Sequence, residues 1–163
     1  MFSNKPNLND RPGYNFVSSV DVAKHVSATL KPTVDDFRAE PYYDATESIP
    51  ETPLFQVYPD SKNTDSQSNS DRASFKAGIR RSDMVVIIDL YARQRSMIGE
   101  DLLACFQLLD EIEIALENEQ TKPYFGLPGV QGFSWRWERQ TFEYGDQKLP
   151  YVGARIYLTL KFF

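Results

Sequence analysis

The sequence predicts an α+β fold: a mostly antiparallel sheet of about four strands, with two or more helices packed on one face. Three segments carry this prediction. Residues 75–91 contain an apolar run, Met84 to Tyr91, whose two faces are both apolar except at Asp89, which is typical of a central strand. Residues 151–163 alternate apolar and polar side chains throughout, which indicates a strand with one buried face. Between them, one segment has apolar residues at helical spacing: Leu102, Cys105, Phe106, Leu109, Ile112 and Leu116.

The N-terminal third has one predicted helix between irregular segments. Residues 1–17 contain several prolines and asparagines and are predicted to form a flexible arm. Ser18 or Ser19 is a suitable N-cap for a helix ending at Leu30, and Pro32 stops it. Residues 33–52 read as an extended connection, and a short strand from Leu54 to Tyr58 ends at Pro59. Residues 59–74 are predicted to be a long polar loop, because almost all of them are Ser, Asn, Asp, Gln or Lys.

The second half of the chain supplies the central helix and two further strands. Ser96 is a plausible N-cap for the central helix, and residues 118–123 end it. Phe133, Trp135 and Trp137 alternate with polar residues, but Phe142 and Tyr144 have the opposite parity, which predicts a bulge at residues 139–141. This strand is expected to pair as a hairpin with residues 151–163.

Composition limits the possible functions. The 163 residues fit a single domain, and 41% hydrophobic residues favour a folded chain. The formal net charge of -5 disfavours a general grip on a phosphate backbone, so no sequence-specific nucleic acid is expected as a partner. One cysteine excludes an intrachain disulfide. There is no signal peptide and no apolar run long enough to span a bilayer, so we expect no membrane partner.

No catalytic, cofactor-binding or metal-binding residues are predicted. His25 is the only histidine, and without a second histidine or a nearby nucleophile it is more often a surface residue than a catalyst. The acidic residues of the central helix lie where a helix normally faces water or another subunit. The GLPG turn at residues 126–129 lacks the lysine of a phosphate-binding loop. We therefore expect a protein that is not an enzyme and carries no cofactor.

Charged side chains are the better candidates for contacts with a partner. Arginines occur at the two ends of the central strand, and their guanidinium groups favour bonds to carboxylates of a neighbouring subunit. The alternative is that they are simply exposed strand ends, which contribute little. Trp135 and Trp137 could stack on a sugar or base, but their alternation favours a place in the core. The candidate contact residues are Arg80, Arg81, Arg93, Arg95, Glu111, Glu113 and Glu117.

The order of these segments resembles the tail terminator (tail completion) proteins of long-tailed bacteriophages. The similarity covers roughly residues 20–163: a helix, a strand with VYPD, a polar loop, VVIIDLYAR, LLDEIEIALE, WRWER and ARIYLTLKFF. The resemblance implies a virion protein, assembled in the host cytoplasm, that forms a ring at the tail–neck junction. Such a ring, a hexamer in this family, ends tail polymerisation and contacts the tail tube protein and a neck or head-completion protein.

Three other functions remain open. A neck or head-tail connector protein would have similar size and serve the same joint. A carbohydrate- or peptide-binding module would use Trp135 and Trp137 on an open sheet, and it requires both indoles to be exposed. An acid/base hydrolase would need two carboxylates facing each other across a cleft about 5 to 10 Å apart.

Overall fold

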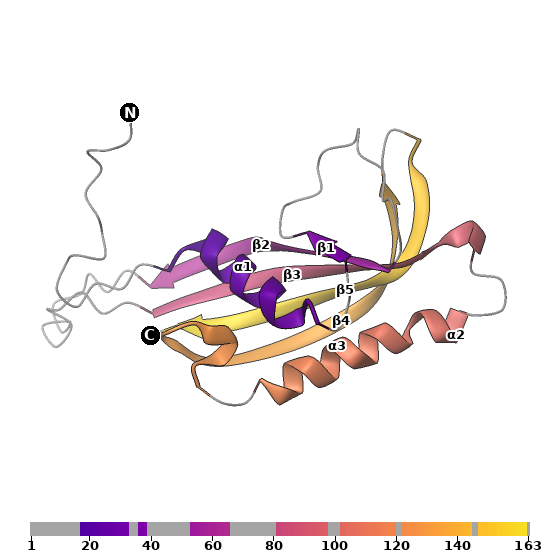
Figure 1. The fold of residues 1–163 in the computed structure, drawn as a ribbon. Coiled ribbons are helices and arrows are strands. Elements are labelled where there is room, and N and C mark those ends of the chain that lie inside the picture. The colour runs from indigo at the N-terminus through magenta and orange to yellow at the C-terminus, as the bar shows by residue number, and fades with distance from the viewer. Residues whose placement is uncertain are drawn as a thin grey trace, which may run out of the picture.

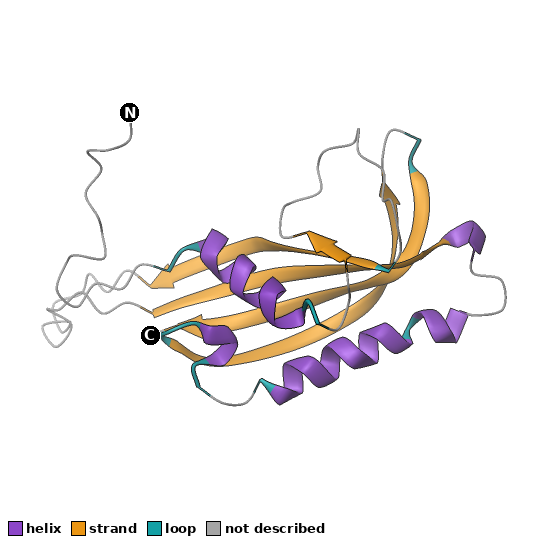
Figure 2. Cartoon of the chain, in the orientation of Figure 1, coloured by secondary structure: helices purple, strands orange, loops and turns teal. Residues whose placement is uncertain are grey.

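A five-stranded sheet with helices on one face forms the body of the protein (Figure 1; Figure 2). The computed structural model describes residues 17–32, 36–38, 53–65, 81–97, 102–119, 122–144 and 147–162. The strand order is β1-β2-β3-β5-β4, with β1 and β2 parallel and the other neighbours antiparallel. The elements are α1 (Ser19–Leu30), β1 (Asp36–Arg38), β2 (Leu54–Asp65), β3 (Arg81–Gln94), η3 (Arg95–Met97), α2 (Leu102–Cys105), α3 (Gln107–Asn118), η4 (Tyr124–Gly126), β4 (Val130–Tyr144) and β5 (Leu149–Phe162).

The predicted α+β fold is confirmed. The four antiparallel strands are those expected from the sequence, and α1 and α3 lie on the same face of the sheet (Figure 2). We call this the helix face. Its core contains Val22 and Val26 of α1, Ile112 of α3 and the inward residues of every long strand, such as Ile88 and Ile156. The three-residue strand β1 was not predicted.

The N-terminal helix has the predicted limits and cap. Ser18 is extended, and its Oγ accepts a hydrogen bond from the Asp21 amide at 3.3 Å. Val22, Val26 and Leu30 are buried, as their shared face requires. The preceding arm, except for Val17, lies outside the described residues.

The second strand is longer than predicted. Pro59 does not end it, since β2 continues to Asp65 and pairs with β3 along its whole length. The β2–β3 pairing register shifts between Pro59 and Ser61. Proline cannot donate a backbone hydrogen bond, and the irregular pairing accommodates it. The first seven residues of the predicted loop 59–74 are therefore strand, and residues 66–74 lie outside the described part of the chain.

The central strand and helix also differ from their predicted limits. Residues 75–80 of the predicted strand lie outside the described residues, and β3 begins at Arg81. Ser96 is not the N-cap: it lies in η3, whereas α2 begins at Leu102. The helix breaks at Phe106, and α3 starts there without a side-chain cap. The local sequence shows which residues could cap a helix, but it does not show where the connection before the helix lets the helix begin.

The bulge predicted at residues 139–141 does not exist. The pairing of β4 with β5 is regular from Gly132 to Tyr144, and the only shift in it lies between Val130 and Gly132. The parity changes because the two ends of β4 bury opposite faces. Phe133 and Trp135 pack against the helix-face core, whereas Phe142 and Tyr144 belong to a cluster on the other side.

This second cluster occupies the opposite face, at the end of the sheet near the β4–β5 turn. Tyr91 is its centre, with ring centroids 4.5 Å from Phe142, 5.8 Å from Tyr144 and 6.0 Å from Tyr151. Leu54 completes the buried set. Both faces of the sheet therefore carry apolar contacts, at different places along the strands.

A close backbone approach lies beside this cluster. The β3–β5 register shifts between Tyr91 and Arg93, which leaves Ala92 as an extra residue in β3. A Cβ added to Gly153 of β5 would overlap the carbonyl oxygen of Leu90 and lie 2.8 Å from its carbon. Only glycine fits at this point without a shift of the strands.

Candidate interaction surfaces

A buried ion pair lies in the middle of the face opposite the helices. The Asp89 carboxylate is fully buried, and its Oδ1 accepts from Nε of Arg155 at 2.7 Å. Its Oδ2 accepts from Arg155 Nη2 at 3.1 Å and from the Tyr58 hydroxyl at 2.7 Å. The carboxylate thus has a bidentate arginine and a phenol as partners, which is how a buried charge is tolerated. The group links three strands of the sheet, since Tyr58 belongs to β2, Asp89 to β3 and Arg155 to β5.

The predicted arginine contacts lie at opposite ends of β3. Arg81 is the first residue of the strand and is exposed, whereas Arg93, also exposed, lies near its last residue. At about 3.3 Å per residue, the two are roughly 40 Å apart. Arg95 is exposed in η3, beside Arg93. Arg80 lies outside the described residues. The structure therefore places Arg93 and Arg95 together and separates them from Arg81.

The predicted acidic contacts divide into exposed and engaged residues. Glu111 and Glu117 are exposed on α3, together with Asp110. Glu113 is half-buried and accepts a 3.1 Å hydrogen bond from Nε1 of Trp135, so it ties α3 to β4. The acidic outer face available to a partner consists of Asp110, Glu111 and Glu117.

The two tryptophans have different surroundings. Trp135 is half-buried, packs against the core and is stacked with Phe133 at a centroid distance of 5.9 Å. This confirms its predicted place on the core side of the sheet. For Trp137 the same prediction is wrong, because 43% of its surface is exposed. Residues from both α2 and α3 lie around this indole but leave an open groove beside it.

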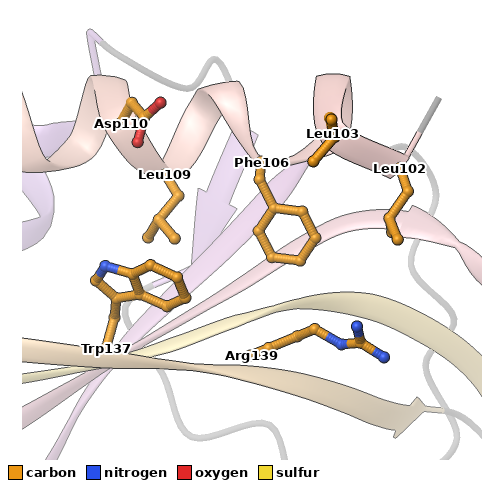
Figure 3. Close-up of a pocket in the computed structure, with 7 residues that line it drawn as sticks. All are labelled: Leu102, Leu103, Phe106, Leu109, Asp110, Trp137 and Arg139. Carbon is orange, nitrogen blue, oxygen red and sulfur yellow. The ribbon is translucent and has the colours of Figure 1, made fainter.

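Trp137 lines an open apolar groove between the helices and β4. The groove has a volume of about 500 Å³. Figure 3 shows Trp137 and Arg139 on β4 facing Phe106 and Leu109 from the helix side. Leu103, 85% exposed, lies at its rim. The lining residues are Leu102, Leu103, Phe106, Leu109, Asp110, Trp137 and Arg139. The groove is apolar with one acidic and one basic group, and it holds no opposed pair of carboxylates.

The opposite face of β4 carries a charged ladder. The Arg136 guanidinium lies 3.9 Å from the ring centroid of Tyr157, its neighbour on β5. The Tyr157 hydroxyl donates to Glu138 Oε1 at 2.9 Å, and Arg136 Nη1 lies 3.8 Å from Glu138 Oε2. Arg136 and Glu138 have side chains 67% and 46% exposed. The three side chains hold one another in place at the edge of the sheet.

Within the described part of the chain, burial shifts the pKa values of Tyr151 and Lys62. Burial, followed by the nearby Tyr144 phenol, raises the pKa of Tyr151 above its ordinary value. Partial burial lowers the pKa of Lys62, whose ammonium donates to the Val17 carbonyl at 2.6 Å.

His25, the single histidine of the sequence, is exposed on α1, near Gly126 of η4. Within the described ranges, no group of His, Cys, Asp and Glu side chains has the arrangement of a metal site. No helix described in the structure is long and apolar enough to cross a membrane.

Sequence reasoning missed the groove and the triad around Asp89. The groove joins residues from two distant segments, so no local pattern indicates it. Asp89 did carry a signal: an acid inside an apolar strand predicts a buried partner, and Arg155 is the basic residue that interrupts the final strand near its middle. In comparisons with known proteins, no protein-family model and no curated protein sequence matches the chain.

Proposed function

We propose that the chain is a structural protein of the virion of long-tailed bacteriophages, one that caps the tail tube as a ring and joins the tail to the neck. The order of segments that resembles tail terminator proteins carries the proposal. An α+β domain of this size with charged surfaces suits a subunit that acts through contacts. The partners would be further copies of the chain, the tail tube protein and a neck protein.

The charged surfaces support a ring contact of defined chemistry. The acidic outer face of α3, with Glu111 and Glu117, and the arginines at the end of β3, Arg93 and Arg95, are of opposite sign and belong to different elements. Two different surfaces that complement each other give a head-to-tail contact, which is the type that closes a ring. Glu113 is a poorer candidate because its carboxylate already binds Trp135.

Light scattering at several protein and salt concentrations tests the ring. The expected result is a species of about six subunits that dissociates as salt screens the contact. Glu111→Arg and Arg95→Glu should each prevent assembly, and an equimolar mixture of the two should restore part of it. Asp60→Arg, which makes the same charge change at an exposed position of β2, is the matched control. If both reversals assemble as the unchanged chain does, this ring contact is wrong.

Binding to isolated tail tubes tests the function itself. A terminator should bind tube ends and stop further addition of the tube protein. A chain that ignores the tube but binds purified neck or portal assemblies would instead be a connector, the runner-up within the same joint. The binding-module alternative is disfavoured, because it requires two exposed indoles and Trp135 is held by Glu113.

A further inference from the structure

The outer edge of β4 is open over a long, regular strand. Among the strands that the structure describes, β4 pairs with β5 and has no neighbour on its other side. It is 15 residues long, and residues 136–139 are all exposed. A long exposed edge presents backbone donors and acceptors to any other strand, so proteins usually shield it or use it.

The side chains along this edge form a pattern that complements itself. Residues 135–139 read Trp-Arg-Trp-Glu-Arg. When a strand pairs antiparallel with its own copy around a twofold axis at Trp137, Arg136 faces Glu138 of the copy and Glu138 faces Arg136. On the helix face, Trp135 faces Arg139 and the two Trp137 indoles meet. Opposite charges and arginine–aromatic pairs are favourable cross-strand neighbours.

Other registers lose this match. An axis at residue 136 or 138 places Arg136 or Glu138 against its own copy, so that like charges meet. An axis at Arg139 sets that arginine against itself, and an axis at residue 135 leaves Glu138 opposite Gly132. Residues directly opposite each other in a sheet point to the same side of it, so the twofold axis must lie between one residue and its own copy. Residues 135, 136, 138 and 139 are therefore the neighbouring positions of the axis.

The groove beside Trp137 fits the same contact. Trp137 and Arg139 line it on the helix face, together with Leu103 and Phe106. In Figure 1, α3 runs along the open side of β4, and the Trp135–Glu113 hydrogen bond fixes it there. A strand added at this edge would lie beside the groove, where its apolar side chains would cover Leu103 and the exposed indole.

We propose that the chain makes a twofold contact in which the β4 strands of two copies pair antiparallel around Trp137 and make one continuous sheet. The occupant of the edge is therefore a second copy of this chain. The dimer goes beyond the proposed function, since a twofold contact uses the same patch on both subunits and closes on itself. It cannot also be the contact that passes from subunit to subunit around a ring, and it uses residues other than those of the ring contact.

Charge reversal on β4 tests this pairing. In Glu138→Arg, two arginines meet at both symmetric positions, and in Arg136→Glu two glutamates do. Each single variant should weaken the dimer by roughly tenfold or more, because two attractive pairs become repulsive. The double variant Arg136→Glu/Glu138→Arg restores both pairs and should dimerise again.

The mixture of the two single variants separates this contact from damage within one subunit. The double variant restores the opposite charges at positions 136 and 138 within one chain as well as between copies, so its recovery has two explanations. In the mixture each chain keeps its own internal change, and only a contact between copies can be restored. The two single variants, mixed in equal amounts, should form mixed dimers because their charges are complementary.

Sedimentation velocity over a range of concentrations measures the dimer, and native mass spectrometry identifies the mixed pair by mass. Circular dichroism of each variant confirms that it is folded. All of these chains carry Arg95→Glu in addition, which breaks the ring contact and leaves only the β4 contact to join copies. The expected result is twice 18.8 kDa for the chain with Arg95→Glu alone and for the chain with the double β4 change, and dissociation for both single β4 changes. The proposal is overturned if the chain with Arg95→Glu alone stays monomeric at its highest soluble concentration. It is equally overturned if the single β4 changes leave self-association as it was, or if their mixture stays monomeric.

Discussion

The buried carboxylate of Asp89 gives the sharpest stability prediction. Replacing it with asparagine keeps the shape but removes the charge that the Arg155 guanidinium faces at 2.7 Å. Breaking a fully buried ion pair on one side costs about 3 to 5 kcal/mol. The Arg155 side chain retains 23% exposure, so water partly solvates it and we expect a loss of roughly 2 to 4 kcal/mol.

Three further variants test the cause of that loss. Tyr58→Phe removes one hydrogen bond to the carboxylate and should cost about 1.5 kcal/mol. The double variant Asp89→Leu/Arg155→Met replaces the pair with apolar side chains, and it should be more stable than the sum of its single changes predicts. Asp83→Asn, an exposed acid on the same strand, is the control and should change stability by less than about 0.5 kcal/mol.

Urea unfolding followed by circular dichroism supplies the free energies, provided that each variant shows a single transition with an unchanged m-value. A cost below about 1 kcal/mol for Asp89→Asn would mean that the ion pair contributes little beyond its desolvation. Strict additivity in the double variant would equally refute the idea that Asp89 and Arg155 act as a pair.

Three other predictions concern the fold. Gly153→Ala should destabilise the chain by roughly 3 kcal/mol or more, because its methyl group would overlap the Leu90 carbonyl; urea unfolding measures this, and a loss under about 1 kcal/mol would contradict it. Above about pH 10 the unfolded chain should release the Tyr151 proton before the folded chain does, so the free energy of unfolding should fall as pH rises. Tyr151→Phe should reduce this dependence on pH in unfolding measured at several pH values, and an unchanged dependence would contradict the prediction. Ser18→Ala removes the 3.3 Å hydrogen bond that caps α1 and should cost about 0.5 to 1 kcal/mol in thermal unfolding. An unchanged melting temperature would show that this hydrogen bond does not contribute to stability.

The elements that the sequence predicted well are those whose pattern follows from burial alone. α1 and β5 show one apolar face with the right period, and the core of β3 is apolar on both faces. The helix-face core and the Tyr91 cluster bury these faces. β2 was predicted too short because its second half, after Pro59, is polar. Pairing with β3 makes it a strand, and no property of its own side chains indicates that.

The remaining errors share a cause: local rules were applied where distant contacts decide. Phe142 and Tyr144 point to the opposite face from Phe133 and Trp135, because Tyr91 on another strand offers them an apolar partner there. Ser96 suits an N-cap, yet the helix begins further on. Of the candidate contact residues, the predicted exposure holds for Arg81, Arg93, Arg95, Glu111 and Glu117, because charged side chains usually face water. The partner that each one meets depends on an assembly that sequence patterns do not encode.

The aromatic cluster around Tyr91 also has a kinetic consequence. The cluster is small and lies on the face away from α1 and α3. The end of the β4–β5 hairpin is therefore held by this cluster and is separate from the main core. Such a region opens by itself more often than the whole chain unfolds. In amide hydrogen exchange, residues 142–144 and 149–151 should exchange before the middle of β3, which marks the hairpin end as a separately opening unit.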